Sequence, residues 1–220
     1  MTATVQPVRR TALYRKHLSL GAAMTDFHGW QVAAQFSAPE DEARLAREAA
    51  GLADVGWMGK LEVQGLWAEA PAIGFGSRSL WPLARGRWLA TYRPEERDAA
   101  TDEIQALASR NPCARLTDVT SVFAAFQLSG PRSREVLRRV TSLDLSDSSL
   151  PEGACAQAGL AHVHTIFLRR DAGGFPCFWL LAAREFGEFT WDTLMHAGRK
   201  FGIVPIGLAA LRKMEPSTRE

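Results

Sequence analysis

The chain has 220 residues and a mass of 24.2 kDa, long enough for a sizeable core and in the range of one or two domains. Its 46% hydrophobic and 23% charged residues are typical of a globular protein, and a net charge of +2 gives no argument for nucleic-acid binding. The longest apolar run, residues 178–183, is far too short to span a bilayer. Three scattered cysteines argue against a disulfide framework and a zinc site, and fit a reducing compartment. We therefore expect a cytoplasmic protein without a membrane or nucleic-acid partner.

Two helices are predicted within the first 50 residues. Thr11 can cap a short helix, and Gly21 would end it. Residues 37–40 form a capping box, Ser-Ala-Pro-Glu, with the proline tolerated in the first turn. This second helix should run to about Ala50, and we expect its charged residues, Glu42 among them, to face solvent.

The middle of the chain predicts two strands and a helix. Residues 60–64 show the period-two alternation of a half-buried strand. Residues 65–86 are rich in glycine and proline and suggest a loop anchored by aromatic side chains. Residues 87–92 predict a strand and residues 98–108 a helix.

The remaining sequence predicts a further antiparallel unit. A strand at 123–128 is followed by two apolar strands, 162–168 and 175–181, which residues 171–174 join as a hairpin turn. A helix then covers 184–199. Strands and helices alternate without long crossover connections, which favours an α+β fold with antiparallel sheets and flanking helices.

One stretch is more specific than the rest. Residues 54–65 read Asp-Val-Gly-Trp-Met-Gly-Lys-Leu-Glu-Val-Gln-Gly, preceded by Asp-Phe-His-Gly-Trp at 26–30 and Gln-Phe-Ser at 35–37. Together they resemble the opening of the glycine-cleavage T-protein (aminomethyltransferase) superfamily, whose members handle tetrahydrofolate. The resemblance implies a T-protein-like folate-binding fold, here lacking the C-terminal β-rich domain of that family.

A second stretch extends the resemblance. Residues 116–137 are again T-protein-like, and residues 141–145 and 153–157 look like the gamma subunit of heterotetrameric sarcosine oxidase, a short relative of the same fold. Pro205–Leu208 matches the place where T-proteins enter the last helix of their folate-binding part. The implied organisation has four parts: an N-terminal extension at 1–10, a first T-protein-like half at 11–110 abbreviated after 65, a second half at 111–215, and a tail at 216–220.

The acids that the family uses are missing here. In T-proteins an aspartate in a Gly-Gly-x-x-Asp-Asp stretch serves the folate nitrogens, and a glutamate in a Thr-Gly-Tyr-Thr-Gly-Glu turn reads the pterin edge. This chain has no such stretch after Gly65, and residues 169–174 read Arg-Arg-Asp-Ala-Gly-Gly. No catalytic residue is therefore identified, and we expect reduced or absent aminomethyltransferase activity. His162 and His164 have a metal-binding spacing but lack a third ligand, so no metal site is predicted.

Four residues are candidates for binding tetrahydrofolate, and each has a structural alternative. Met58 matches a family methionine beside the pterin ring, or is core packing. Asp54 faces the pocket or caps its turn. Asp171 replaces the pterin-reading glutamate or is an ordinary hairpin-turn aspartate. Arg212 meets a glutamate tail or an acidic partner, or is solvated.

Two functions remain open. In the first, the chain binds folate and a small amine in one-carbon metabolism. In the second, it is a non-catalytic, gamma-type subunit that docks onto a larger flavoprotein amine oxidase.

Overall fold

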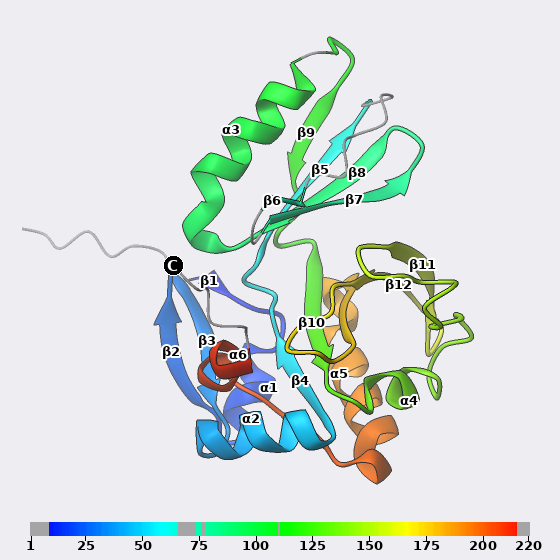
Figure 1. Ribbon diagram of the computed structural model, residues 1–220. Helices are drawn as coiled ribbons and strands as arrows, with labels where there is room; N and C mark the ends of the chain where they lie inside the picture. The colour runs from blue at the N-terminus through cyan, green and yellow to red at the C-terminus, as the bar shows by residue number, and fades with distance from the viewer. Residues whose placement is uncertain (1–8, 66–73, 76–77, 110, 215–220) are drawn as a thin grey trace, which may run out of the picture.

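Three β-sheets with helices packed on them make up the protein. The computed structural model describes residues 9–65, 74–75, 78–109 and 111–214. In Figure 1 a five-stranded sheet and helix α3 lie at the top, and the other two sheets lie below them. The described helices include none that is long and apolar enough to cross a membrane.

The smallest sheet has the order β1-β3-β2 and is formed near the N-terminus. Strands β2 and β3 are an antiparallel hairpin, whereas β1 runs parallel to β3. The elements of this part are β1 (Arg9–Arg10), α1 (Tyr14–Ser19), β2 (Ala23–Phe27) and β3 (Trp30–Gln35).

The six-stranded sheet has the order β11-β12-β13-β10-β4-β14 and is antiparallel except for the parallel pair β4 and β14. Its strands are β4 (Ala50–Asp54), β10 (Phe123–Ser129), β11 (Cys155–Leu160), β12 (Val163–Arg169), β13 (Cys177–Ala183) and β14 (Ile203–Pro205). The helices around it are α2 (Pro39–Glu48), α4 (Ser133–Leu137), α5 (Gly187–Gly198) and α6 (Leu208–Met214), with short 3₁₀ turns η2 (Arg184–Phe186) and η3 (Arg199–Phe201).

The five-stranded sheet, order β6-β7-β8-β5-β9, is antiparallel throughout its named pairs. Helix α3 packs against β5, β8 and β9. The elements are β5 (Gly59–Gln64), β6 (Gly74–Phe75), β7 (Arg78–Ala84), β8 (Arg87–Tyr92), η1 (Pro94–Glu96), α3 (Arg97–Ala108) and β9 (Arg115–Asp118).

Strands from both predicted halves share these sheets. Strand β4 pairs with β10 and with β14, and β5 pairs with β9. A central apolar cluster, containing Trp30, Met58, Trp81, Ile166 and Leu208, joins residues from all three sheets and from α6. The division at residues 110 and 111 is therefore a division of the sequence resemblance, and it remains a prediction.

The capping of the first two helices was predicted wrongly. Helix α1 begins at Tyr14 without a side-chain cap, and the Thr11 hydroxyl has no hydrogen-bond partner in the described part of the chain. Helix α2 likewise lacks a capping box. Instead, the Glu42 carboxylate accepts backbone N–H groups of the residues just before the helix. The Glu42 side chain is therefore buried, and its predicted solvent exposure was wrong.

Glu42 joins three segments of backbone. Its carboxylate accepts the N–H of Phe36 at 2.5 Å, of Ser37 at 2.6 Å and of Gly207 at 2.8 Å. At Gly207 a Cβ atom would lie 2.2 Å from the Ala34 carbonyl oxygen, so only glycine permits this approach. A carboxylate satisfied by several N–H donors tolerates burial, which explains how an acidic residue occupies the inner face of α2.

Several strands differ from the expectations. Residues 65–86 contain the strands β6 and β7 rather than loop alone, and β2, β3, β4 and β11 were not predicted at all. Strand β5 is present, but it is buried on both faces rather than on one. Helix α3 covers the face that carries Leu61 and Val63. On the opposite face, Lys60 donates to backbone carbonyl groups and Glu62 pairs with Arg87.

Candidate functional site

Asp54 occupies the turn between β4 and β5. Its Oδ1 accepts the N–H of Gly56 at 2.9 Å, and its Oδ2 lies 3.0 Å from Nε2 of His17. The side chain of His17 is 1% exposed and that of Asp54 is 7% exposed. Both oxygens of this carboxylate are thus engaged inside the protein, and one of them caps the turn.

His17 was not singled out from the sequence. It projects inward from α1, and its ring contacts Phe36 and Trp191 edge to face, with centroid distances of 5.3 and 5.0 Å. Its Nδ1 has no hydrogen-bond partner among the described residues. The sequence carried one signal for it, a histidine on the inner face of an otherwise short amphipathic helix.

Lys60 is a buried lysine at the start of β5, next to the same turn. Its Nζ donates to the carbonyl oxygens of Met58 at 2.6 Å, Gly56 at 3.1 Å and Thr120 at 3.5 Å. Burial lowers the pKa of Lys60 to about 7, and the negative charge of Asp54 opposes this shift. Lys60 therefore holds the backbone of residues 56–60 in place and can titrate near neutral pH.

Met58 lies between Asp54 and Lys60 in the sequence. Its side chain is 5% exposed and belongs to the central apolar cluster, alongside Trp81 and Leu83. In this position the thioether is a packing group, and a flat ligand reaches it only where neighbouring side chains move.

Arg212 reaches the same region from α6. It is exposed, and its guanidinium carbon lies 5.0 Å from the centre of the Phe27 ring. Phe27 in turn packs edge to face against Trp57 at 4.9 Å. Two aromatic rings therefore connect Arg212 to the turn that carries Met58.

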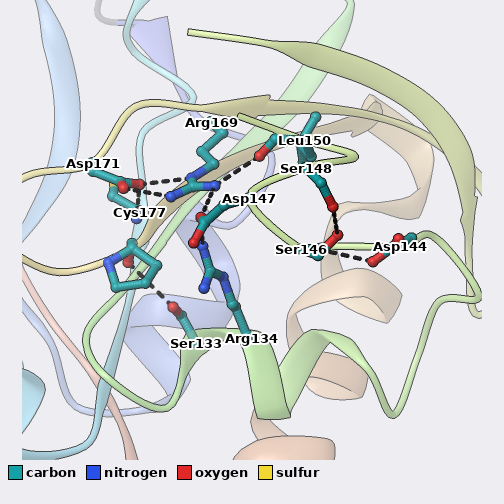
Figure 2. A network of polar contacts seen from close by, with 11 residues as sticks. Ser133, Arg134, Asp144, Ser146, Asp147, Ser148, Leu150, Arg169, Asp171 and Cys177 are labelled. Atoms are coloured by element: carbon teal, nitrogen blue, oxygen red, sulfur yellow. Dashed lines mark hydrogen bonds and ion pairs between the residues drawn. The ribbon is translucent and has the colours of Figure 1, made fainter. Parts of the chain in front are cut away.

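Asp171 belongs to a different network, shown in Figure 2. Arg169 donates two hydrogen bonds to its carboxylate, from Nε at 3.0 Å and from Nη2 at 2.7 Å, and the N–H of Cys177 adds a contact at 3.3 Å. Arg169 also pairs with Asp147, which pairs with Arg134. The Asp171 carboxylate raises the pKa of the Arg169 guanidinium, as a fork-shaped ion pair should.

The structure thus brings together three of the four candidates. Asp54 and Met58 share one turn, and Arg212 adjoins it through Phe27, whereas Asp171 is tied into the network around Arg169. Whether any of the four contacts a cofactor remains a prediction.

The two histidines with metal-like spacing do not form a site. His162 has a φ of +70° and lies in the tight turn between β11 and β12, while Nε2 of His164 lies 3.2 Å from Oε1 of Gln157. Within the part of the chain that the structure describes, no three histidine, cysteine, aspartate or glutamate side chains gather as metal ligands.

Comparison with known proteins agrees with this architecture. The chain is 27% identical over 229 residues to an aminomethyltransferase of Moorella thermoacetica, covering 92% of this chain and 62% of the relative. It is 30% identical over 230 residues to an aminomethyltransferase of Streptomyces avermitilis, covering 91% of this chain and 60% of the relative. The chain therefore spans less than two thirds of the length of these enzymes.

Two solved structures show the same fold. The glycine cleavage system aminomethyltransferase T of Bartonella henselae superposes with a TM-score of 0.74 at 18% identity, covering 94% of this chain and 62% of that one. A chain of the heterotetrameric sarcosine oxidase of Corynebacterium sp. U-96 superposes with a TM-score of 0.64 at 20% identity, covering 89% and 97%. The predicted α+β, T-protein-like fold is confirmed.

The family model described as the GCVT N-terminal domain matches residues 13–86 and 80–217. These matches cover most of the chain, including the turn with Asp54 and Met58 and the helix with Arg212. The chain belongs to the family of the GCVT N-terminal domain.

Proposed function

We propose that the chain is a folate-binding, T-protein-like protein of one-carbon and methylated-amine metabolism with reduced or no aminomethyltransferase activity. Membership of the GCVT family supports the folate part of this proposal. The observation that carries the second part is that both candidate carboxylates are engaged internally, Asp54 by His17 and Gly56, and Asp171 by Arg169.

Aminomethyl transfer needs a group that orients the amine and exchanges protons beside the folate nitrogens. A carboxylate serves this purpose only when an oxygen is open to the ligand. The two oxygens of Asp54 and the two of Asp171 are all engaged by donors of the protein itself. The family's own acidic motifs are absent from the sequence as well, and both observations support reduced or absent transfer activity.

Binding makes smaller demands than catalysis. The flexible thioether of Met58 suits the face of a flat heterocycle, and the exposed guanidinium of Arg212 suits the carboxylates of a glutamate tail. Because Met58 is nearly covered, folate would enter by displacing neighbouring side chains of the central cluster. We therefore expect binding that is weaker than a preformed pocket would give.

Calorimetric titration with tetrahydrofolate and with 5-formyltetrahydrofolate tests this function. We expect saturable binding that Arg212→Ala weakens about ten-fold, or about 1.4 kcal/mol. Lys213→Ala is the matched control, because Lys213 lies on the same helix and pairs with Glu40. Absence of binding at high micromolar folate would overturn the proposal. Formation of methylene-tetrahydrofolate from an aminomethyl donor as fast as a full-length aminomethyltransferase forms it would overturn its second part.

A second function has its own support. The chain covers 97% of the matched subunit of heterotetrameric sarcosine oxidase but only 62% of the Bartonella aminomethyltransferase. We propose as the alternative that it is a non-catalytic subunit of a larger flavoprotein amine oxidase. Phe186 and Phe189, which are 44% and 51% exposed at the start of α5, would then belong to the docking surface, with Val122 beside them.

Co-expression with the oxidase subunits of the same genome distinguishes the two functions. The alternative predicts a stable complex that forms without folate and that Phe189→Asp disrupts. Glu188→Ala, a change at a neighbouring position of α5, should leave the complex intact. A chain that purifies alone in the presence of those subunits would contradict the alternative and leave the folate titration as the deciding measurement.

A further inference from the structure

A small cavity of about 60 Å³ lies on another side of the turn that carries Met58. Trp57 and Gly59 line it, whereas Met58 between them does not. The remaining walls come from β1, from the hairpin of β2 and β3, from the end of β8 and the turn η1, from the start of α3, and from Thr120 after β9. The cavity is therefore separate from the four candidate residues discussed above.

Two arginines and one histidine line this cavity: Arg9, Arg97 and His28. His28 lies 3.7 Å from Glu95 and Arg97 lies 3.4 Å from Asp118, and all four of these side chains are more than 40% exposed. Such exposed pairs are weak and exchange readily with another anion.

Arg9 is the cation without a carboxylate. Its guanidinium carbon lies 5.7 Å from the centre of the Trp30 ring, and its backbone N–H donates to the Gly29 carbonyl. Among the residues that the structure describes, no aspartate or glutamate forms an ion pair with it. Stacking on an indole holds the guanidinium in place while its N–H donors stay open to a ligand.

Tyr92 lines the same space. Burial and the negative charge of Asp118 raise the pKa of Tyr92, whereas the positive charge of Arg97, a hydrogen bond with Thr120 and the positive charge of Arg9 oppose that rise. A Cβ atom on Gly59 would lie 2.1 Å from two carbon atoms of the Tyr92 ring. The glycine therefore leaves room for the Tyr92 ring, which lines the cavity together with it.

We propose that this cavity binds the carboxylate group of a small organic acid, with Arg9 as its main donor and Tyr92 and Arg97 as further donors. Planar guanidinium groups match the geometry of a carboxylate, which makes arginine the usual reader of this group. Trp30 and Trp57 supply apolar walls for a short hydrocarbon. A water-sized site needs about 10–15 Å³, so this space holds roughly four to six heavy atoms, the size of acetate or glycine.

Sodium acetate is the probe for this site. Because Trp30 and Trp57 line the cavity, tryptophan fluorescence of the full chain should change saturably with acetate, against sodium chloride at the same ionic strength. Arg9→Ala should weaken binding at least ten-fold. Arg10→Ala is the matched control, because Arg10 stacks on Tyr14 at 4.4 Å and does not line the cavity.

Tyr92→Phe gives a second, finer variant, since it keeps the ring and removes the hydroxyl. We expect a two- to five-fold weaker affinity for acetate, with folate binding unchanged in both Arg9→Ala and Tyr92→Phe. Either of two results would overturn the proposal: a response to acetate that matches sodium chloride, or equal losses in Arg9→Ala and Arg10→Ala. Circular dichroism melts of each variant show that the fold is retained, so a loss of binding reports on the site.

Discussion

The turn at residues 54–60 and the hairpin at residues 169–177 each carry an aspartate that the family resemblance places near a cofactor. In the turn, the polar groups are covered: Asp54, its hydrogen-bond partner His17 and the nearby Lys60 all lie inside the protein. In the hairpin, Arg169 is buried, but Asp171 is 26% exposed and Asp147 is 72% exposed.

The comparison shows that the contribution of a polar pair to stability depends on how deeply the pair is buried. Charges removed from water depend on every partner they have, since an uncompensated buried charge is strongly unfavourable. Charges at the surface are screened by water and salt and lose little when a partner is removed. Removing a partner in the turn should therefore destabilise the fold strongly, whereas removing one in the hairpin should have a smaller effect on stability.

The largest effect should follow from removing the buried partner of Asp54. His17→Ala leaves this carboxylate without its imidazole, and we expect the free energy of unfolding to fall by about 3–5 kcal/mol, measured by urea denaturation. Lys16, the residue before His17, forms an ion pair with the exposed Asp192. Lys16→Ala removes this pair and should change the free energy of unfolding by about 1 kcal/mol or less. Similar effects of the two substitutions would end the distinction between buried and exposed pairs.

Lys60 should make stability depend on pH. Its pKa is about 7 in the folded protein and near 10.5 in the unfolded chain, so between these values the unfolded state binds the extra proton. Stability should therefore rise from pH 7 to pH 10, by up to about 1.4 kcal/mol per pH unit, and the part due to Lys60 should be fully lost below pH 7.

Lys60→Met isolates that contribution, because it keeps the length of the side chain and removes the titrating amine. The difference between wild type and this variant, from urea denaturation at pH 7 to 10, should slope upward with pH. A constant difference would show that the amine stays protonated throughout this range.

A smaller effect is expected in the hairpin. Asp171→Asn keeps the size of the side chain but weakens the fork that Arg169 makes with it, which we expect to lower the free energy of unfolding by about 1–2 kcal/mol. Because Asp171 is partly exposed, 1 M sodium chloride should reduce this difference by about half. A loss in the free energy of unfolding as large as that caused by His17→Ala would show that the hairpin pair contributes as much to stability as the buried pair in the turn.

The smallest effect should come from a fully exposed pair. Arg44 on α2 contacts Asp41 and Glu48, and all three side chains are more than half exposed. Arg44→Ala should leave the free energy of unfolding unchanged within experimental error, because water and salt screen such a pair. A clear fall in the melting temperature of this variant would show that exposed charges contribute more to stability here than their exposure predicts.

The sequence predicted the elements that depend on local signals. The strand at 87–92 was predicted with its observed bounds, and the helix at 98–108 begins one residue earlier, at Arg97. Gly202 ends the segment after α5 in the left-handed conformation, as a C-terminal glycine should. Strand β11 was missed because Cys-Ala-Gln-Ala-Gly-Leu carries little strand propensity and is a strand through its pairing with β12.

The site was predictable in part for the same reason. An aspartate that caps its own turn, as Asp54 does with Gly56, is a local arrangement that the sequence suggested. Its second partner, His17, lies 37 positions away and was visible only in the folded chain. The Arg169–Asp171 pair had a local signal, an arginine two residues before the aspartate, whose meaning depends on the burial of Arg169.

The hydrogen bonds of Glu42 are completed only late in the synthesis of the chain. Its carboxylate accepts N–H groups of Phe36 and Ser37, close by in the chain, and of Gly207, which is 165 positions later. At a translation rate of about 5–20 residues per second, roughly 8–33 seconds separate the appearance of the acceptor from that of its last donor. During that interval α2 and β4 lack both this hydrogen bond and the pairing with β14. A nascent chain halted before Gly207 should therefore remain sensitive to proteases at α2, and this sensitivity should disappear once Gly207 and the following helix have left the ribosome.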